Sequence, residues 1–506
     1  MRFIDNFLNK ITMYRLVLYY LLGLLAVAII LSIFGILPYN PILLLSSSLV
    51  FILTCFLVNI IFSRVFRAPT NVESVYITAL ILAFIITPAT SFTDTGFLLF
   101  ALWASIWAMA SKFILAIKKK HIFNPAAFAV AITGIALGQS ASWWVGTLAL
   151  LPFVFVGGFL ITRKIKRTDL VASFMLVATV GIFLSHFSSA NSFKLAGQIL
   201  FYSPLFFFAF IMLTEPLTTP PSKILRILYG SLVGLLFIPS LHIGSIYSTP
   251  ELALVLGNIF SYLVSPKQKL ILKLKAKVKV ASDVYDFIFK TDKRVAFQPG
   301  QYFEWTLAHQ STDSRGSRRY FTIASSPTRK DIVMGVKFYP KGSSFKKELY
   351  ALKTGDTIIA SQLAGAFVLP KNKNKKLAFL AGGIGVTPFR SMTESIIDQE
   401  EKRDIVLFYS NKVVSDIAYK DLFDRSKAYG IKTIYTLTDK KAVPVPWLHK
   451  VGYIDRAMIE KEAPDWQERV FYLSGPFTAV RAFEKTLLEM GVARSHIKKD
   501  FFPGFA

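Results

Sequence analysis

Apolar runs that could cross a lipid bilayer follow one another through the first 265 residues. A membrane helix needs roughly 17 to 25 such residues, and eight runs reach this length while two are shorter. So many continuous apolar segments exclude an ordinary soluble enzyme, because a water-soluble fold cannot bury them all. The runs occupy residues 16–36, 41–63, 72–88, 95–117, 123–138, 142–161, 169–187, 198–213, 223–240 and 244–264.

Charge divides the chain into two parts that need different solvents. Residues 1–265 contain 16 Lys and Arg and six acidic residues, whereas residues 266–506 contain the other 42 and 25. We therefore expect a polytopic α-helical membrane domain of about ten helices at 1–265, followed by a soluble part. The net charge of +27 fits attraction to lipid headgroups or to phosphate-bearing cofactors, and no nucleic-acid reading module accompanies it.

Basic residues between the apolar runs predict the orientation. If the N-terminus is cytoplasmic, Arg64, Arg67 and the lysines at 118–120 lie in cytoplasmic loops, whereas Lys194 lies outside. Cytoplasmic loops are enriched in Lys and Arg. We therefore expect an integral protein of a prokaryotic cytoplasmic membrane whose soluble part faces the cytoplasm. The first run lacks a small-residue cleavage site and predicts an anchor, not a removable signal.

The soluble part changes its pattern near residue 370. Before it, period-two alternation at 272–280 and 284–290, with short strands at 301–307 and 332–339, predicts an antiparallel β-barrel domain at 266–370. After it, apolar strands at 377–380, 405–409, 433–437 and 470–473 alternate with helical segments. This alternation predicts an α/β domain with a parallel sheet at 371–506.

The stretch RRYFTIASSP, residues 318–327, combines paired cations, aromatic rings and hydroxyl groups. Arg319 can bind a pyrophosphate through two parallel hydrogen bonds. Phe321 offers a flat face to a planar ring, and Thr322 can hydrogen-bond at the edge of that ring. Taken alone, a basic edge strand with half-buried aromatics would explain the same letters.

Two further segments have the composition of nucleotide-binding turns. The stretch AGGIGVTP, residues 381–388, follows a strand and precedes a helix, so its glycines allow a dinucleotide to approach the backbone. Pro388 stands where a third glycine would be expected, but proline suits the first turn of a helix. The segment 342–344 opens another predicted helix, whose N-terminal N–H groups can reach a phosphate.

In this order, the motifs resemble those of the ferredoxin–NADP reductase family of flavoprotein reductases, over residues 268–506. The resemblance implies an NAD(P)H-dependent oxidoreductase that binds FAD. On the residues that match, it implies FAD contacts for Arg319, Phe321, Thr322, Ser325, Gly342, Ser343 and Ser344. It implies NADH or NADPH contacts for Gly382, Gly383, Gly385, Thr387, Gly475 and Pro476.

Three of the matched positions are expected to act in catalysis. Thr322 would lie near the reactive nitrogen of the flavin, and Ser474 stands where the family often has cysteine. Phe505 belongs to an aromatic tail, 500–505, that resembles the one covering the flavin in related reductases, although a packed terminal strand is the alternative. The choice between NADH and NADPH stays open, because Lys412 could receive a 2′-phosphate that Asp416 would repel.

Two segments of the membrane domain echo each other. The stretch AFIITPAT ends the third apolar run, and AFIMLTEP ends the eighth. A five-plus-five inverted repeat predicts this similarity, and broken helices at a repeat interface commonly border a ligand site. We single out Asn124 and Glu215 as candidate cofactor contacts, because buried polar groups in membrane helices are costly. Helix capping and a proline turn are the alternative explanations.

The membrane domain resembles, over residues 15–265, the flavin-carrying membrane subunits of the sodium-pumping NADH:quinone reductase and of the Rnf complex. The resemblance rests on FNPAA at 123–127 and LTEPLT at 213–218. Those relatives carry covalent FMN on a threonine, for which the loop at 139–143 offers no match. We therefore expect a non-covalent FMN or riboflavin, or a quinone. The single cysteine, Cys55, excludes a Cys-rich metal site supplied by this chain, and no metal is expected.

Together these features predict a membrane-bound flavoprotein oxidoreductase. Electrons would pass from cytoplasmic NAD(P)H through FAD to a flavin or quinone in the membrane, and either stop there or continue across it. The acceptor would be a quinone or an extracytoplasmic redox protein, and no nucleic acid is involved. Two alternatives remain, namely a component of a redox-driven ion pump and a reductase that is merely anchored to the bilayer.

Overall fold

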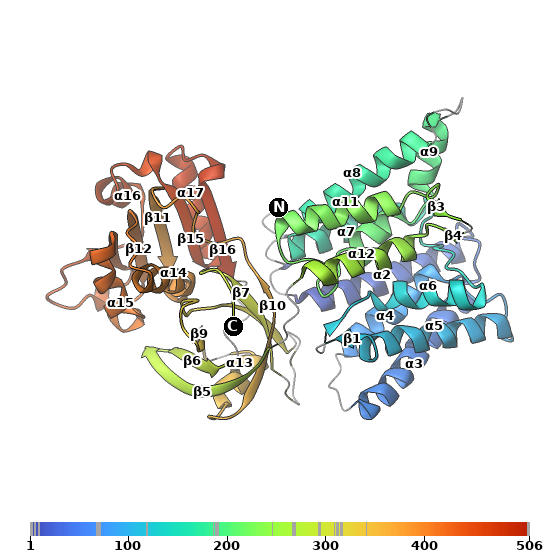
Figure 1. Cartoon of the computed structure of the whole chain (residues 1–506), viewed down its shortest axis with the longest axis horizontal. Coiled ribbons are helices and arrows are strands. Elements are labelled where there is room, and N and C mark those ends of the chain that lie inside the picture. The colour runs from blue at the N-terminus through green and yellow to red at the C-terminus, as the bar shows by residue number, and fades with distance from the viewer. Residues whose placement is uncertain are drawn as a thin grey trace. The chain divides into compact units, whose positions relative to one another are not determined.

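A computed structural model of the chain describes two compact units, residues 1–267 and 268–506. Both units are drawn in Figure 1. The residues described are 4, 7–8, 11–66, 72–117, 120–185, 187, 192–244, 246–265, 270–291, 295–307, 309, 313, 317–340 and 342–502.

The N-terminal unit is built from helices, with two short hairpins between them (Figure 1). Its helices are α2 (Met13–Ile33), α3 (Pro41–Val65), α4 (Val72–Ile85), α5 (Thr95–Phe113), α6 (Pro125–Leu137), α7 (Leu151–Ile165), α8 (Thr168–Ser185), α9 (Ser192–Phe201), α10 (Leu205–Phe207), a π-helix (Phe208–Met212), α11 (Lys223–Leu236) and α12 (Pro250–Val264). The hairpins are β1 (Ala116–Ile117) with β2 (Lys120–His121), and β3 (His242–Ile243) with β4 (Ile246–Tyr247).

Helical segments overlap all ten predicted apolar ranges, but several boundaries are shifted. The tenth run was expected to begin at residue 244, whereas β4 occupies Ile246–Tyr247 and α12 begins at Pro250. The sixth run was expected to be helical from residue 142, whereas α7 begins at Leu151. The backbone N–H groups of Ser142 and Trp143 both donate to the Ile85 carbonyl at 2.9 Å, and Trp143 has a positive φ of 52°. These contacts bind the loop to the end of α4. The prediction of a helix at 142–150, which used apolar composition alone, was therefore wrong.

Polar side chains followed by proline start several of these helices. The Asn40 side chain accepts hydrogen bonds from the N–H groups of Ile42 and Leu43, at 2.9 and 3.2 Å. Asn124 Oδ1 accepts from Ala127 at 3.1 Å, and Thr249 Oγ1 accepts from Leu252 at 3.4 Å. Each cap satisfies an N–H group that the first helical turn leaves unpaired, and each precedes a proline that needs no such partner.

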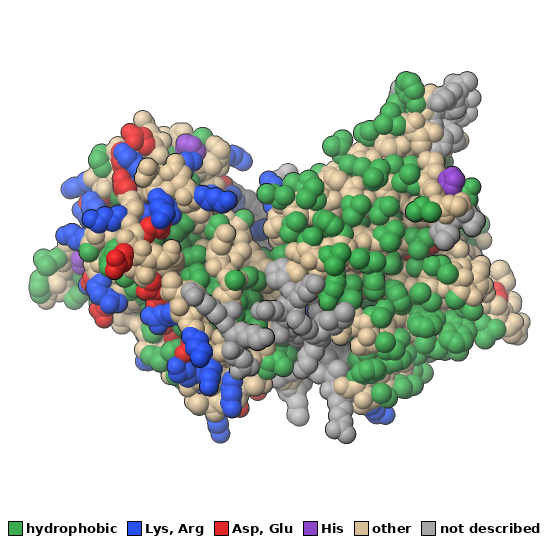
Figure 2. Space-filling model, in the orientation of Figure 1, with side chains coloured by type: hydrophobic (Ala, Val, Ile, Leu, Met, Phe, Trp, Pro, Cys, Tyr) green, Lys and Arg blue, Asp and Glu red, His purple; other side chains and the backbone are tan. Residues whose placement is uncertain are grey.

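Helix α3 is apolar on its exposed face and more polar on its buried face. Its leucine and isoleucine side chains at 45, 49, 53, 57 and 61 recur every fourth residue and are exposed. Its buried face contains Ser47, Ser48, Cys55 and Asn59. This arrangement is the reverse of a water-soluble helix. Figure 2 shows hydrophobic side chains over the visible face of the N-terminal unit, with few charges among them.

Among the described residues, four helices are long and apolar enough to cross a membrane, by length and composition. They are α2, α3, α5 and α8, with mean hydropathies between 1.4 and 2.7. The shorter apolar helices α4, α6 and α12 have 10–17 residues. The count of ten spans therefore stays a prediction.

The C-terminal unit contains a six-stranded antiparallel sheet. Its strands are β5 (Leu270–Ala281), β6 (Val284–Lys290), β7 (Tyr302–Thr306), β8 (Arg318–Thr322), β9 (Ile332–Lys337) and β10 (Thr357–Ala364), in the order β8-β7-β10-β5-β6-β9. A full barrel would need a ladder between the two end strands. Instead the described chain just beyond β8 reaches β9 through a backbone bond from Ala324 N to Val333 O at 2.8 Å and through a bond from Val333 N to Ser325 Oγ at 3.1 Å.

The alternation of β5 is interrupted by register shifts between Leu274 and Ala276 and between Lys279 and Ala281. A bulge reverses the face to which the following side chains point, so strict period-two alternation did not describe the whole strand. Helix α13 (Ser344–Ala351) follows β9, and its Phe345 and Leu349 side chains are buried in the core of this sheet.

The second sheet is parallel throughout. Its strands are β11 (Leu377–Gly382), β12 (Ile405–Asn411), β13 (Ile431–Leu437), β14 (Lys450–Val451), β15 (Val470–Pro476) and β16 (Ile497–Phe502), in the order β14-β13-β12-β11-β15-β16. Helices α14 (Thr387–Asp398) and α15 (Lys420–Arg425) pack on one face, where Phe389 and Phe423 join the core. Helices α16 (Arg456–Glu462) and α17 (Phe477–Glu489) cover the other face with Ile459 and Phe483.

The central strands confirm the predicted α/β pattern. The four predicted strands lie within β11, β12, β13 and β15, because continuous apolar runs suit strands that are buried on both faces. The short strand β14 was missed, since it has no apolar run, whereas β16 agrees with the terminal strand that was the alternative for the tail at 500–505. Because the carboxyl ends of parallel strands share one edge, Gly382, Asn411 and Ser474 are brought to the same edge of the sheet.

Candidate cofactor sites

The Arg-Tyr-Phe-Thr segment forms β8 and lies beside α13. The Arg319 guanidinium is buried, lies 5.1 Å from the Phe345 ring centre and donates from Nη1 to the Arg318 carbonyl at 2.7 Å. The Phe321 and Phe345 ring centres are 6.1 Å apart. The structure therefore brings together two motifs that are distant in the sequence, the strand motif and the turn before α13.

The turn before α13 is already partly occupied by internal hydrogen bonds. Ser343 caps the helix by accepting from Lys346 N at 3.3 Å. The Ser344 hydroxyl accepts from Asp313 N and lies 2.9 Å from His309 Nε2, and Ser344 N donates to Asp313 Oδ2 at 2.9 Å. Gly342 contributes backbone without a side chain. Phosphate contacts by the hydroxyls of this turn remain a prediction, and only rearrangement would free the Ser344 hydroxyl.

Two buried hydroxyls fit a bound flavin and nicotinamide. Thr322 is 2% exposed and Ser474 is fully buried, and neither hydroxyl has a hydrogen-bond partner among the described residues. An unsatisfied buried polar group is unfavourable, and ligands are a common explanation for one in a native fold. Both are at or near the positions where the motifs predict a cofactor. Ser325 differs, because its hydroxyl accepts from Val333 N at 3.1 Å and ties the segment to β9.

The glycine turn after β11 is in contact with the end of β15. A Cβ on Gly385 would lie 2.3 Å from Gly475 Cα, and one on Gly382 would lie 3.5 Å from Pro476 Cδ. Gly383 has a φ of +51°, which favours glycine. The two predicted nucleotide segments thus form one surface at the carboxyl edge of the sheet, where dinucleotides bind in folds of this type. Thr387 begins α14 and donates to Ile384 O at 3.2 Å.

Asp416, the acidic residue expected to repel the 2′-phosphate of NADPH, forms an ion pair with Lys337. Asp416 lies 3.0 Å from Lys337 Nζ of β9, and both side chains are mostly buried. Its charge is thus largely balanced within the protein. The tail at 500–502 forms the end of β16, parallel to β15, whereas Phe505 lies outside the described residues and its proposed catalytic role stays a prediction.

The two polar residues singled out in the N-terminal unit contact each other, although 91 positions separate them. Asn124 Nδ2 donates to Glu215 Oε2 at 2.9 Å, and His121 Nε2 lies 3.3 Å from Glu215 Oε1. Asn258 continues the network, accepting from Asn124 N at 2.7 Å and donating to the Tyr229 hydroxyl at 3.0 Å. Capping therefore explains the Asn124 oxygen, while its amide binds Glu215. Nothing in the sequence pattern pointed to Asn258.

The Glu215 cluster lies at a break between helices. It follows the π-helix Phe208–Met212, a conformation often found at functional sites. Unlike the hydroxyls of Thr322 and Ser474, both carboxylate oxygens of Glu215 have protein partners. No group of three His, Cys, Asp or Glu side chains that could hold a metal occurs within the described ranges.

Family models match both sheets of the C-terminal unit. Residues 271–368 match the oxidoreductase FAD-binding domain, and residues 379–485 match the oxidoreductase NAD-binding domain. The C-terminal half carries an FAD-binding and an NAD-binding oxidoreductase domain. These are the domains of NAD(P)H-dependent FAD oxidoreductases, as the motifs predicted.

Curated relatives match the same half. The chain is similar to the glycine betaine monooxygenase reductase subunit of Chromohalobacter salexigens, with 28% identity over 235 residues, 44% of this chain and 62% of that protein. It is also similar to a flavohemoprotein of Bacillus thuringiensis subsp. konkukian, with 26% identity over 241 residues, 45% of this chain and 59% of that protein. The chain thus spans about three fifths of the length of these relatives.

Two solved structures are similar to 46% and 47% of this chain. One is the flavohem-like FAD/NAD-binding domain of nitric oxide dioxygenase from Vibrio cholerae, with 18% identity, 46% of this chain and 98% of that one covered, and a TM-score of 0.41. Another is the cytochrome b5 reductase domain of Ulva prolifera nitrate reductase, with 23% identity, 47% and 98% coverage, and a TM-score of 0.41.

Proposed function

We propose that this chain is a membrane-bound flavoprotein oxidoreductase that carries electrons from NAD(P)H through FAD to a non-covalent flavin or a quinone in the N-terminal unit. The observation that carries the proposal is the pair of buried, unpartnered hydroxyls, Thr322 and Ser474, at two motifs for FAD and nicotinamide. FAD, when bound, supplies a hydride acceptor that can release electrons singly.

The chain's own residues hold and orient the two nucleotides. Arg319 is proposed to bind the FAD pyrophosphate, and Phe321 to lie against the flavin ring. Thr322 would donate a hydrogen bond to the flavin edge, while Gly382, Gly383 and Gly385 would let the dinucleotide approach the backbone. Ser474 would lie beside the nicotinamide, together with Gly475 and Pro476. Burial of this edge would exclude water from the reacting groups.

The exposed apolar face of α3 supports a membrane location for the N-terminal unit. Leucines spaced every fourth residue would face lipid, while small and polar side chains pack inside. The positive-inside pattern supports a cytoplasmic C-terminal unit. The hydrocarbon core is roughly 30 Å thick, so transfer across it would need a second carrier, for which Asn124 and Glu215 are the proposed contacts.

Cofactor content and acceptor use test this proposal on the full chain purified in detergent. Flavin is extracted and identified, and the chain in sealed vesicles is supplied with NADH or NADPH and a quinone analogue. Bound FAD with nucleotide-dependent quinone reduction would support the proposal, and a second flavin would extend the path into the membrane unit. Absence of FAD, or sodium-dependent turnover with net sodium transport, would contradict it, the latter in favour of a pump.

A further inference from the structure

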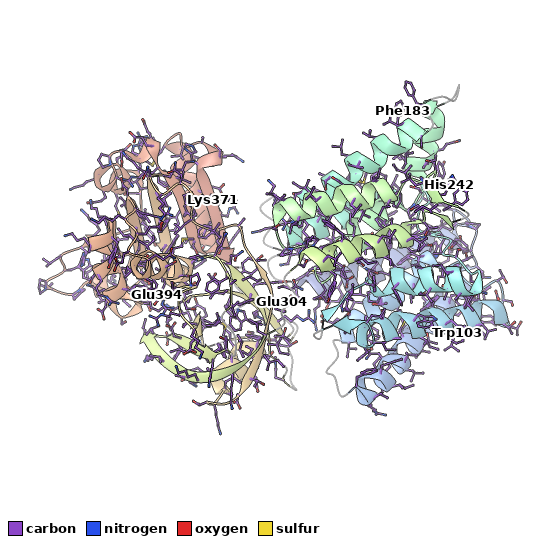
Figure 3. The ribbon with its side chains drawn as sticks, in the orientation of Figure 1. Trp103, Phe183, His242, Glu304, Lys371 and Glu394 are labelled. Carbon is purple, nitrogen blue, oxygen red and sulfur yellow. The ribbon has the colours of Figure 1, made fainter. Side chains whose placement is uncertain are left out.

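A buried polar interface joins the two sheets of the C-terminal unit through helix α14. Three α14 side chains bind the segment that follows the flavin strand β8. Arg390 Nη1 donates to the Ala324 carbonyl at 2.6 Å, and Ser391 Oγ donates to the Ser325 carbonyl at 2.7 Å. Glu394, labelled in Figure 3, accepts from Ser326 N at 2.7 Å.

The same helix begins at the nucleotide-binding turn. Thr387 and Pro388 form its first turn and are separated from Gly385, the last glycine of the turn, only by Val386. Arg390 is therefore one turn away from the residues predicted to bind the nicotinamide nucleotide, and its bond partner lies two residues after Thr322. A single helix thus connects the two halves of the reaction site.

Arg390 is fixed from three sides. Its Nη2 lies 3.5 Å from Asp286 Oδ2 of β6, and its guanidinium lies 4.7 Å from the Tyr419 ring centre. The Tyr419 hydroxyl donates to Asp286 Oδ1 at 2.6 Å. A residue of the first sheet and a residue at the start of α15, which packs on the second sheet, therefore enclose one charged group. Arg390 and Asp286 are 8% and 5% exposed, so water screens their attraction only weakly.

The surroundings allow little freedom of movement. A Cβ on Gly335 of β9 would lie 2.5 Å from the Tyr419 hydroxyl, 2.9 Å from Thr387 Cγ2 and 3.2 Å from Asp286 Oδ1. Burial raises the pKa of Asp286, while the charge of Arg390 and the hydrogen bond from Tyr419 lower it. The carboxylate and guanidinium are thus mutually dependent, because either alone would be a buried unpaired charge.

We propose that Arg390 is a positioning residue that aligns the nicotinamide-binding turn with the flavin strand. The inference rests on the proposed function. Arg390 acts through its contacts with Ala324 and Asp286, and this role requires no contact between Arg390 and either nucleotide. Hydride transfer is sensitive to small displacements, and a misplacement of about 1 Å can lower a rate roughly a hundredfold. Loss of the guanidinium would let α14 and its glycine turn shift relative to β8.

The test uses the full chain purified with FAD, in wild-type, Arg390→Ala and Arg390→Lys forms. Flavin reduction by NADH and NADPH is followed in a single turnover and expressed per bound FAD, so that partial FAD loss does not enter the rate. A second reading is the long-wavelength charge-transfer absorbance that reports stacking of nicotinamide on the reduced flavin. Thermal unfolding is recorded for each form.

A matched control is Arg469→Ala. Arg469 is also buried and paired, with Asp404 at 2.8 Å and Asp465 at 2.6 Å, but it immediately precedes β15 at the end opposite Ser474. Its loss should lower the unfolding temperature without changing the reduction rate. Arg390→Ala should lower the rate per bound FAD roughly ten- to a hundredfold and weaken the charge-transfer absorbance, and Arg390→Lys should restore part of both.

The outcomes separate the two claims. A wild-type flavin that neither nucleotide reduces would contradict the proposed function itself, and the inference with it. A wild-type flavin that is reduced, with Arg390→Ala equally fast per bound FAD, would overturn the positioning role alone. Equal slowing in Arg469→Ala would also overturn it, because general destabilisation would then explain the effect.

Discussion

The candidate sites of the two units bury their polar side chains in opposite ways. In the N-terminal unit, Glu215 and Asn124 satisfy one another, and Asn258 and Tyr229 extend their network. In the C-terminal unit, the hydroxyls of Thr322 and Ser474 are buried without partners among the described residues. A ligand can therefore enter the second site without breaking an internal bond. Any ligand that contacts Glu215 must replace bonds that already exist, so the FAD site rests on the stronger structural argument.

The largest change in cofactor binding is expected at the flavin strand β8, which contains the unpartnered Thr322 hydroxyl. Replacing Arg319 and Phe321 together by alanine should remove the phosphate and ring contacts and yield chain with less than about a tenth of the wild-type FAD, since a lost pair of charge-assisted bonds costs about 1.5–3 kcal/mol each. Visible absorbance of the purified protein measures the FAD content. Full yellow colour and normal NAD(P)H oxidation would contradict the assignment.

Glu215 should affect only the later part of the electron route. In Glu215→Ala the amide of Asn124 loses its acceptor, and leaving a buried group unsatisfied costs about 1–3 kcal/mol. We expect NAD(P)H to reduce FAD normally while quinone reduction falls at least severalfold. Glu251→Gln is the control, because Glu251 is another buried carboxylate of this unit, bonded to Trp143 Nε1 at 3.0 Å. Unchanged quinone reduction in Glu215→Ala would exclude this residue from the route.

Thr322→Val should have opposite effects on stability and on catalysis. The hydroxyl has no described partner, so its removal should leave the unfolding temperature of FAD-free protein unchanged or raise it by the equivalent of about 1 kcal/mol. Flavin reduction by NAD(P)H should slow about tenfold if the hydroxyl bonds to the flavin. Calorimetry on FAD-free protein and single-turnover absorbance give the two values. A clear loss of stability without FAD would indicate an internal partner.

Ser474→Cys should give the smallest change. The reductase family that the motifs resemble often has cysteine at this position, and the resemblance implies that serine slows hydride transfer, so cysteine should raise the single-turnover rate by a few fold. Ser474→Ala provides the comparison, because it removes the polar atom from the same buried position. A rate that is equal in all three forms would exclude this side chain from the reaction.

Sequence predicted the C-terminal unit far better than the N-terminal one. In the C-terminal unit, each binding segment, such as 382–385 or 319–325, consists of adjacent residues. Its glycines, and its position at the end of a strand or the start of a helix, therefore predict its backbone conformation from the sequence. Even so, Arg390 was missed, because its partners lie at 286, 324 and 419 and only folding brings them together.

In the N-terminal unit, the letters identify apolar segments but few contacts. Asn124 and Glu215 were chosen because polar groups are rare there, whereas their meeting depends on the packing of helices distant in sequence. The loop at 142–150 was taken as helix, because an apolar composition does not reveal that Ser142 and Trp143 bind the Ile85 carbonyl. The composition thus predicts that this unit is surrounded by lipid, but it does not predict the contacts between its helices.

The most direct test of the central claim is an anaerobic titration of the purified full chain with NADH and, separately, NADPH. We expect the chain to contain one FAD, and we expect at least one nucleotide to bleach its visible absorbance completely. This should need one equivalent for the FAD and one more for each further flavin or quinone that the chain holds. A chain without flavin, or a flavin that neither nucleotide reduces while dithionite does, would contradict it.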